Sequence, residues 1–130
     1  MNKRNITKSD KQDITLAPNL PFKLQKAIKY TGKNYMDPDL CLKDIAESVH
    51  MHPKSFSFLW NKYVEISIPD FINELRIRNA KKLLIKTTDY SFEIARRVGY
   101  NSYHFNRVFK VKIGTSPNQY RNSRSQKLFI

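Results

Sequence analysis

Five side chains that can donate hydrogen bonds or stack on flat rings lie close together late in the chain. They are Tyr103, His104, Asn106, Arg107 and Lys110. Arginine and asparagine have paired polar groups that fit the edges of nucleic-acid bases, and lysine is a point charge suited to phosphate. The chemistry that this stretch suggests is therefore recognition of a nucleic acid rather than catalysis.

The apolar residues between these polar groups predict how they are positioned. Phe105, Val108 and Phe109 follow the i, i+3, i+4 spacing of an amphipathic helix, which leaves the polar groups on its outer face. A shorter helix precedes it, and its apolar positions are Ile94, Ala95 and Val98, followed by Gly99 as a helix-ending residue. The small Ala95 allows the second helix to approach the first closely. Two short helices joined by a tight turn form a helix-turn-helix unit.

The same pattern occurs once more, 49 residues earlier, with no gap. The earlier residues are Ile45, Ala46, Val49, Phe56, Leu59, Trp60, Ser67 and Phe71. They align in order with Ile94, Ala95, Val98, Phe105, Val108, Phe109, Ser116 and Tyr120. Two copies are too few for a solenoid. The sequence therefore predicts two helix-turn-helix units.

The outer face of the first unit differs from that of the second. Pro53 is suited to open its second helix, and Trp60 falls at a core position. The expected exposed side chains are Lys54, Ser57, Phe58, Asn61 and Lys62. Phe58 stands where the second unit has Arg107, and an aromatic ring can contact a thymine methyl group but cannot form a bidentate bond to guanine.

The remaining elements complete an all-α, seven-helix domain in which a long linker helix joins the two units. We expect a flexible arm or interdomain linker at 1–20, the first unit at 21–68, the linker helix at 69–87, the second unit at 88–124 and a basic, frayed tail at 125–130. The linker helix spans about 27 Å, which suits two recognition helices about 34 Å apart in successive major grooves. We place Arg76, Arg78, Lys81 and Lys82 on its polar sides, most of them solvated.

The charge supports an anionic partner. The formal net charge is +13, and 40% of the residues are apolar, which is enough for compact helical cores. The segment from Ser91 to Ile130 contains eight basic residues and one acidic residue, Glu93, so the second unit and its tail have a formal net charge of +7. Nucleic acid is the first candidate partner and an anionic membrane surface the second.

Other classes of function find little support. No apolar run reaches the roughly 20 residues of a membrane span and no signal peptide opens the chain, so we expect a cytoplasmic protein without a membrane partner. Cys41 is the only cysteine, and His50, His52 and His104 have no metal-site spacing. We expect no cofactor, no metal and no enzymatic activity, because no nucleophile, base or carboxylate pair is clustered.

Two positions in the first unit are unusual. Cys41 stands at the N-cap of the helix that begins near Leu42, with Asp44 as a partial capping box. A redox role for this thiol remains open beside the simpler reading of a tolerated cap. His50 stands where the second unit has Gly99, a position that favours positive φ.

The combined motifs resemble the DNA-binding domain of the AraC/XylS family of bacterial transcription regulators. The signature is Ile94-Ala95-x-x-Val98-Gly99-Tyr100, then Phe105-x-Arg107-Val108-Phe109-Lys110, then Gly114-x-Ser116-Pro117-x-x-Tyr120-Arg121. The stretch Leu75 to Leu84 looks like the linker-helix pattern of the family. The resemblance implies insertion of both units into adjacent major grooves and contact with RNA polymerase in activators. His50 and Phe58 depart from the usual glycine and arginine of the first unit.

We thus expect a sequence-specific binder of double-stranded DNA. The side chains assigned to base readout are Lys54, Ser57, Phe58, Tyr103, His104, Asn106 and Arg107. Those assigned to phosphate are Asn61, Lys62, Arg96 and Lys110. We expect the second unit to dominate affinity. The chain is either a complete small regulator or the output domain of one with an N-terminal sensor or dimerisation domain, and we favour the latter. The alternative function is a basic helical module that binds an acidic protein or binds DNA non-specifically.

Overall fold

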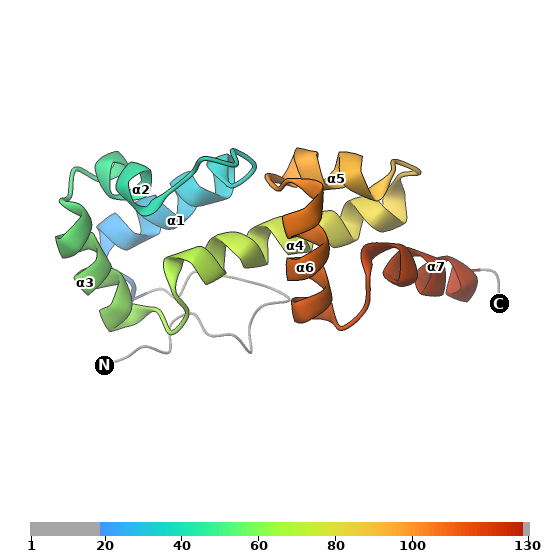
Figure 1. The fold of residues 1–130 in the computed structure, drawn as a ribbon. Coiled ribbons are helices and arrows are strands. Elements are labelled where there is room, and N and C mark those ends of the chain that lie inside the picture. The colour runs from blue at the N-terminus through green and yellow to red at the C-terminus, as the bar shows by residue number, and fades with distance from the viewer. Residues whose placement is uncertain (1–18, 129–130) are drawn as a thin grey trace. The chain divides into compact units, whose positions relative to one another are not determined.

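A computed structural model describes residues 19–128 of the chain, with side chains as far as Arg124 (Figure 1). These residues form seven helices and no sheet. The helices are α1 (Phe22–Asn34), α2 (Leu42–Ser48), α3 (Pro53–Tyr63), α4 (Ile68–Lys86), α5 (Ser91–Val98), α6 (Ser102–Ile113) and α7 (Pro117–Leu128). The predicted all-α class is confirmed. Among the described residues, no helix combines the length and the apolar character needed to cross a bilayer. The arm expected at 1–20 lies almost entirely outside the described residues.

The chain divides into two compact units. Among the described residues, the first comprises 19–35 and 39–74, and the second comprises 36–38 and 75–128. Helix α4 belongs to the first unit as far as Glu74 and to the second from Leu75 onward. The loop between α1 and α2 therefore contributes residues 36–38 to the second unit.

The core of the first unit is built around Trp60. Its ring centroid lies 6.0 Å from that of Phe56 and 5.4 Å from that of Phe71, the latter in an edge-on arrangement. The indole Nε1–H donates a hydrogen bond of 2.9 Å to the carbonyl of Ile66. The side chain is fully buried, which confirms the prediction that Trp60 is a core residue. This packing fixes α3 against the start of α4.

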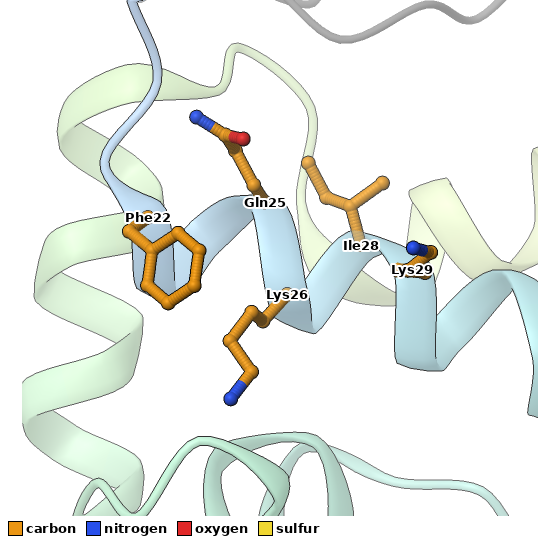
Figure 2. A pocket seen from close by; sticks show the side chains of 5 residues that line it. All are labelled: Phe22, Gln25, Lys26, Ile28 and Lys29. Atoms are coloured by element: carbon orange, nitrogen blue, oxygen red, sulfur yellow. The ribbon is translucent and has the colours of Figure 1, made fainter.

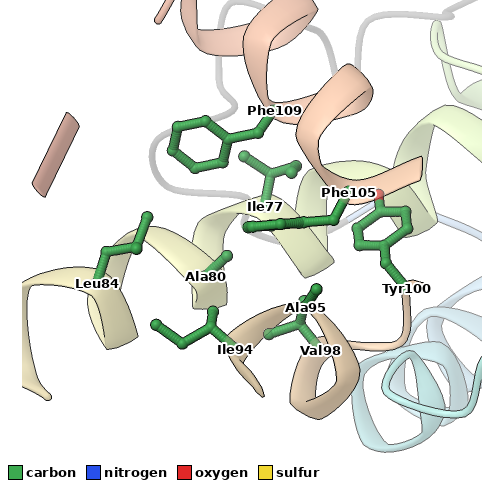
Figure 3. Packing of buried hydrophobic residues seen from close by; sticks show 9 residues of the cluster. All are labelled: Ile77, Ala80, Leu84, Ile94, Ala95, Val98, Tyr100, Phe105 and Phe109. Atoms are coloured by element: carbon green, nitrogen blue, oxygen red, sulfur yellow. The ribbon is translucent and has the colours of Figure 1, made fainter. Parts of the chain in front are cut away.

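The core of the second unit joins three helices (Figure 3). Its buried members are Ile77, Ala80 and Leu84 from α4, Ile94, Ala95 and Val98 from α5, Tyr100, and Phe105 and Phe109 from α6. Ala95 is fully buried at the centre, as its small size predicts. Tyr120 of α7 packs against Phe109 at a centroid distance of 5.6 Å, which confirms that it folds back onto the core.

The backbone repeats as the sequence does. His50 and Gly99 both have positive φ, 58° and 108° respectively. In the first unit the N–H of Met51 donates to the carbonyl of Ala46 at 3.0 Å, and in the second the N–H of Tyr100 donates to that of Ala95 at 2.8 Å. In each unit this hydrogen bond, together with the αL residue before the donor, closes the C-terminus of the first helix of the helix-turn-helix pair, α2 or α5. His50 therefore adopts the positive φ of the aligned Gly99.

Helix starts repeat as well. The hydroxyl of Ser67 accepts from the N–H of Asp70 at 3.2 Å before α4, and that of Ser116 accepts from Gln119 at 3.1 Å before α7. The N–H of Ser116 in turn donates to Oε1 of Gln119 at 3.0 Å, which completes a capping box. Helix α7 then continues to Leu128, so the tail expected to be frayed at 125–130 is helical as far as that residue. The segment contains no proline or glycine to stop a capped helix.

Arg76 is the clearest departure from the sequence-based expectation. We expected a mostly solvated face for this arginine, but its side chain is only 8% exposed. The guanidinium donates to the carbonyl of Asp37 at 2.9 Å and lies 5.2 Å from the centre of the Tyr100 ring. Burial lowers the pKa of Arg76 from its ordinary value, while Tyr100 and Asp37 act in the opposite direction. The guanidinium of Arg76 therefore makes its contacts inside the second unit.

Candidate nucleic-acid interface

Helix α6 presents the polar face that the sequence predicts. The side chain of Asn101 caps the helix by accepting from the N–H of His104 at 2.8 Å, while Phe105 and Phe109 are buried beneath it. The side chains on the opposite face are exposed, namely Tyr103, His104, Asn106, Arg107, Lys110 and Val111. Hydrogen-bond donors and an exposed ring therefore lie together on one rigid helix, as base recognition requires.

Helix α3 is held in the same way but presents a different face. Nδ1 of His52 accepts from the N–H of Lys54 at 3.1 Å, and Pro53 occupies the first helical position. Of the residues assigned to its outer face, four are exposed, namely Lys54, Phe58, Asn61 and Lys62. Ser57 is half-buried on the flank of the helix, so it is less accessible than the other residues assigned to base readout.

Arg96 and its neighbour have different surroundings on α5. Arg96 is exposed, in line with its assignment to phosphate. Arg97 forms an ion pair with Asp89 at 2.8 Å. Both arginines line a shallow depression together with Asp89 and Glu93.

Three residues that support or flank the outer faces of α3 and α6 were not singled out from the sequence. Val111 is 81% exposed on α6 although its side chain is apolar, and the sequence analysis assigned it to neither face. The repeat itself was a usable signal, because Val111 aligns with the exposed Lys62. His52 and Asn101 act as N-caps, and Asn101 in particular belongs to the residue types that favour this position.

The turn before α6 is supported from inside the second unit. The ring of His104 meets the ring of Tyr100 edge-on at 5.2 Å, and Arg76 lies over Tyr100. Tyr100 is buried, and its ring centroid also lies 5.9 Å from that of Phe105. The first turn of α6 is therefore positioned by a stack that begins at the buried arginine.

A shallow groove lies beside α1 (Figure 2). It has a volume of about 270 Å³ and is lined by Phe22, Gln25, Lys26, Ile28 and Lys29. Phe22 is 71% exposed, and Nζ of Lys26 lies 5.6 Å from the centre of its ring. None of these residues belongs to either helix-turn-helix pair.

Comparison with known proteins agrees with this geometry. A sequence profile described as a helix-turn-helix domain matches residues 45–123. The arabinose operon regulatory protein of Escherichia coli is 28% identical over 115 residues, which cover 88% of this chain and 39% of that protein. The C-terminal domain of AraT, a response regulator from Geobacillus stearothermophilus, has a TM-score of 0.78 at 33% identity and covers 81% of this chain and 88% of that domain.

The chain belongs to the AraC/XylS family. The DNA-binding domain of AdpA, solved in complex with a target DNA, shares the AraC/XylS fold with a TM-score of 0.75 over 81% of this chain and 95% of that one, at 17% identity. The chain spans only 30% to 39% of the length of three curated relatives that it matches, which include the arabinose operon regulatory protein.

The motif of this AraC/XylS chain is largely structural. Gly99 and Gly114 have φ of 108° and 98° at the ends of α5 and α6. The guanidinium of Arg121 donates to the carbonyls of Leu84 at 2.8 Å and Thr87 at 3.1 Å, and so caps the end of α4.

Proposed function

We propose that this chain is the DNA-binding domain of a bacterial AraC-type transcription regulator that reads double-stranded DNA with α3 and α6. The observation that supports this most strongly is the exposed outer face of each helix. Lysine or arginine is present on both faces, and neither helix contains an acidic residue. Such a face attracts phosphate and lets the remaining side chains reach base edges.

Specific roles follow from side-chain chemistry. Base readout is assigned to Lys54, Ser57, Phe58, Tyr103, His104, Asn106 and Arg107. Contact with phosphate is assigned to Asn61, Lys62, Arg96 and Lys110, and Lys54 can reach either a base edge or a phosphate. Each recognition helix would enter one major groove, and the two grooves would be adjacent. Arg107 is the strongest candidate, because an exposed arginine can bind O6 and N7 of guanine together.

The wider role also has support from length. The curated relatives are much longer than this chain, which leaves room in such proteins for a sensor or dimerisation domain. We propose that such a domain acts together with this chain and that the bound regulator contacts RNA polymerase in the bacterial cytoplasm. The domain assignments made from the sequence are part of the same proposal, with α4 as the linker.

Selection of binding sites from a random pool of duplex DNA tests the proposal. The purified chain should enrich a site with two blocks about one helical turn apart, and affinity should fall steeply with salt. A single enriched block would indicate that only one unit reads bases. Enrichment of no sequence, together with salt-dependent binding to any duplex, would favour the alternative of a non-specific or partner-binding basic module.

A further inference from the structure

The outer faces of the two recognition helices have opposite arrangements of charge. Residues spaced by four lie on one face of a helix, and on α3 these are Lys54, Phe58 and Lys62. The equivalent residues on α6, 49 positions later, are Tyr103, Arg107 and Val111. On α3 two cations flank an aromatic ring, whereas on α6 an aromatic and an aliphatic side chain flank a cation.

We propose that Phe58 reads the methyl group of thymine, so that the first unit prefers a thymine-containing block while the second reads guanine through Arg107. This inference rests on the proposed function and names the base chemistry of each unit. The chemical class of ligand for Phe58 is the C5-methyl edge of an A·T pair in the major groove of duplex DNA.

The position of Phe58 suits this role. It follows the buried Phe56 by two residues, which places it about 200° away around the helix axis, and it is 75% exposed. Phe56 and Trp60 hold the opposite side of α3 in the core of the first unit. The ring therefore projects away from the protein at the position where the second unit has its arginine.

The two lysines supply the charge that the ring lacks. Lys54 and Lys62 are exposed and separated by eight residues, or about 12 Å along the axis. The major groove is about 12 Å wide, so the two ammonium groups can reach phosphates on both sides while Phe58 faces the base edges. The first unit thus obtains affinity from phosphate and specificity from apolar contact.

Phenylalanine has no donor or acceptor, which limits what it can recognise. In the major groove, the C5-methyl group is the apolar feature that separates thymine from the other bases. Burial of that methyl group against the ring removes both from water. A guanine or cytosine at the same place would present polar edges that the ring leaves without a hydrogen-bond partner.

The charge around Phe58 favours DNA over a protein as its partner. Helix α3 contains Lys54 and Lys62 and no acidic residue. An exposed aromatic ring within such a face fits a polyanion that also offers apolar groups, and thymine-containing duplex DNA has both. A protein partner on Phe58 is the competing outcome of the test below.

The test removes the C5-methyl group of thymine from the DNA and, separately, the ring of Phe58 from the protein. The two-block site selected from the random pool is prepared with deoxyuridine in place of thymine in one block at a time. Binding is measured for the wild-type chain, for Phe58→Ala and for a matched control, Phe22→Ala. Phe22 is 71% exposed in the same unit but lies on α1, outside the recognition helix.

We expect the wild-type chain and Phe22→Ala to lose about fourfold in affinity for each contacted thymine in the first block, the value of one buried methyl group. Phe58→Ala should bind more weakly to the thymine site and lose sensitivity to deoxyuridine. If Phe58→Ala were as sensitive to deoxyuridine as the wild-type chain, the inference would be overturned and the proposed function would stand. An unchanged affinity and site for Phe58→Ala would overturn it in favour of a protein partner. If the wild-type chain enriches no site, the proposed function itself fails.

Discussion

Helices α3 and α6 are held by equivalent packing and expose different chemistry. Each has an aromatic pair in the core of its unit, Phe56 with Trp60 in one and Phe105 with Phe109 in the other. Each follows a left-handed residue and a side-chain N-cap. The exposed faces nevertheless have opposite arrangements of charge. The repeat therefore preserves the support of the recognition helix, while the outer face is free to change.

Truncation of the equivalent core aromatics tests whether the supports match. Trp60→Ala and Phe109→Ala should each destabilise the fold by about 3–5 kcal/mol, because both leave a large cavity. The cost for Trp60 should be the larger, since the carbonyl of Ile66 also loses its donor. Urea denaturation followed by circular dichroism measures both. A small loss for one and a large loss for the other would show that the units are not supported alike.

Replacement of Arg107 and of Phe58, the central residues of the two outer faces, should cause losses of base discrimination of different size. Arg107→Ala should lose about 1–3 kcal/mol of discrimination at one base pair, the value of a bidentate contact. Phe58→Ala should lose less, because an apolar contact with a methyl group is worth about 0.8 kcal/mol. Titration of selected and mismatched duplexes gives both values. Equal losses would contradict the expectation that the second unit dominates affinity.

The turn residues offer a smaller contrast. Gly99→Ala should cost about 1–2 kcal/mol, because φ of 108° is outside the region that a side chain tolerates. His50→Gly should change stability by less, since φ of 58° lies within the left-handed region that His can occupy. Thermal unfolding of the two variants beside wild type checks this. A larger change for His50 than for Gly99 would refute the equivalence of the turns.

The smallest expected effects concern the flanking lysines of α3. Lys62→Ala should reduce the slope of log affinity against log salt by about 0.9, with little change in sequence preference. Lys54→Ala should also alter the preference at one base pair, because Lys54 is assigned to base readout. Val111→Ala, at the equivalent of Lys62, should leave the slope unchanged and serves as the control. Affinities measured from low to moderate salt provide the slopes. For Lys62→Ala, an altered sequence preference without a change in slope would move this lysine from phosphate to base edges.

The helices and much of the core were readable from local patterns. Apolar spacing placed Trp60 and Ala95 in the interior, and the repeat placed a left-handed residue at His50. Arg76 was misplaced, because its partner Asp37 lies 39 residues away in a loop that no local pattern relates to α4. Val111 was missed for the opposite reason, since an apolar residue on an exposed face breaks the pattern by which faces are assigned. The assignments to base and phosphate remain predictions.

Selection of DNA sites by a Phe58→Arg variant tests the difference between the two units most directly. The substitution gives the first unit the arginine that the second has, on an exposed position where folding is not at stake. We predict that the first block changes from thymine to guanine at one position and that the second block stays the same. Identical sites from the wild-type and variant chains would contradict it, because Phe58 would then face no base.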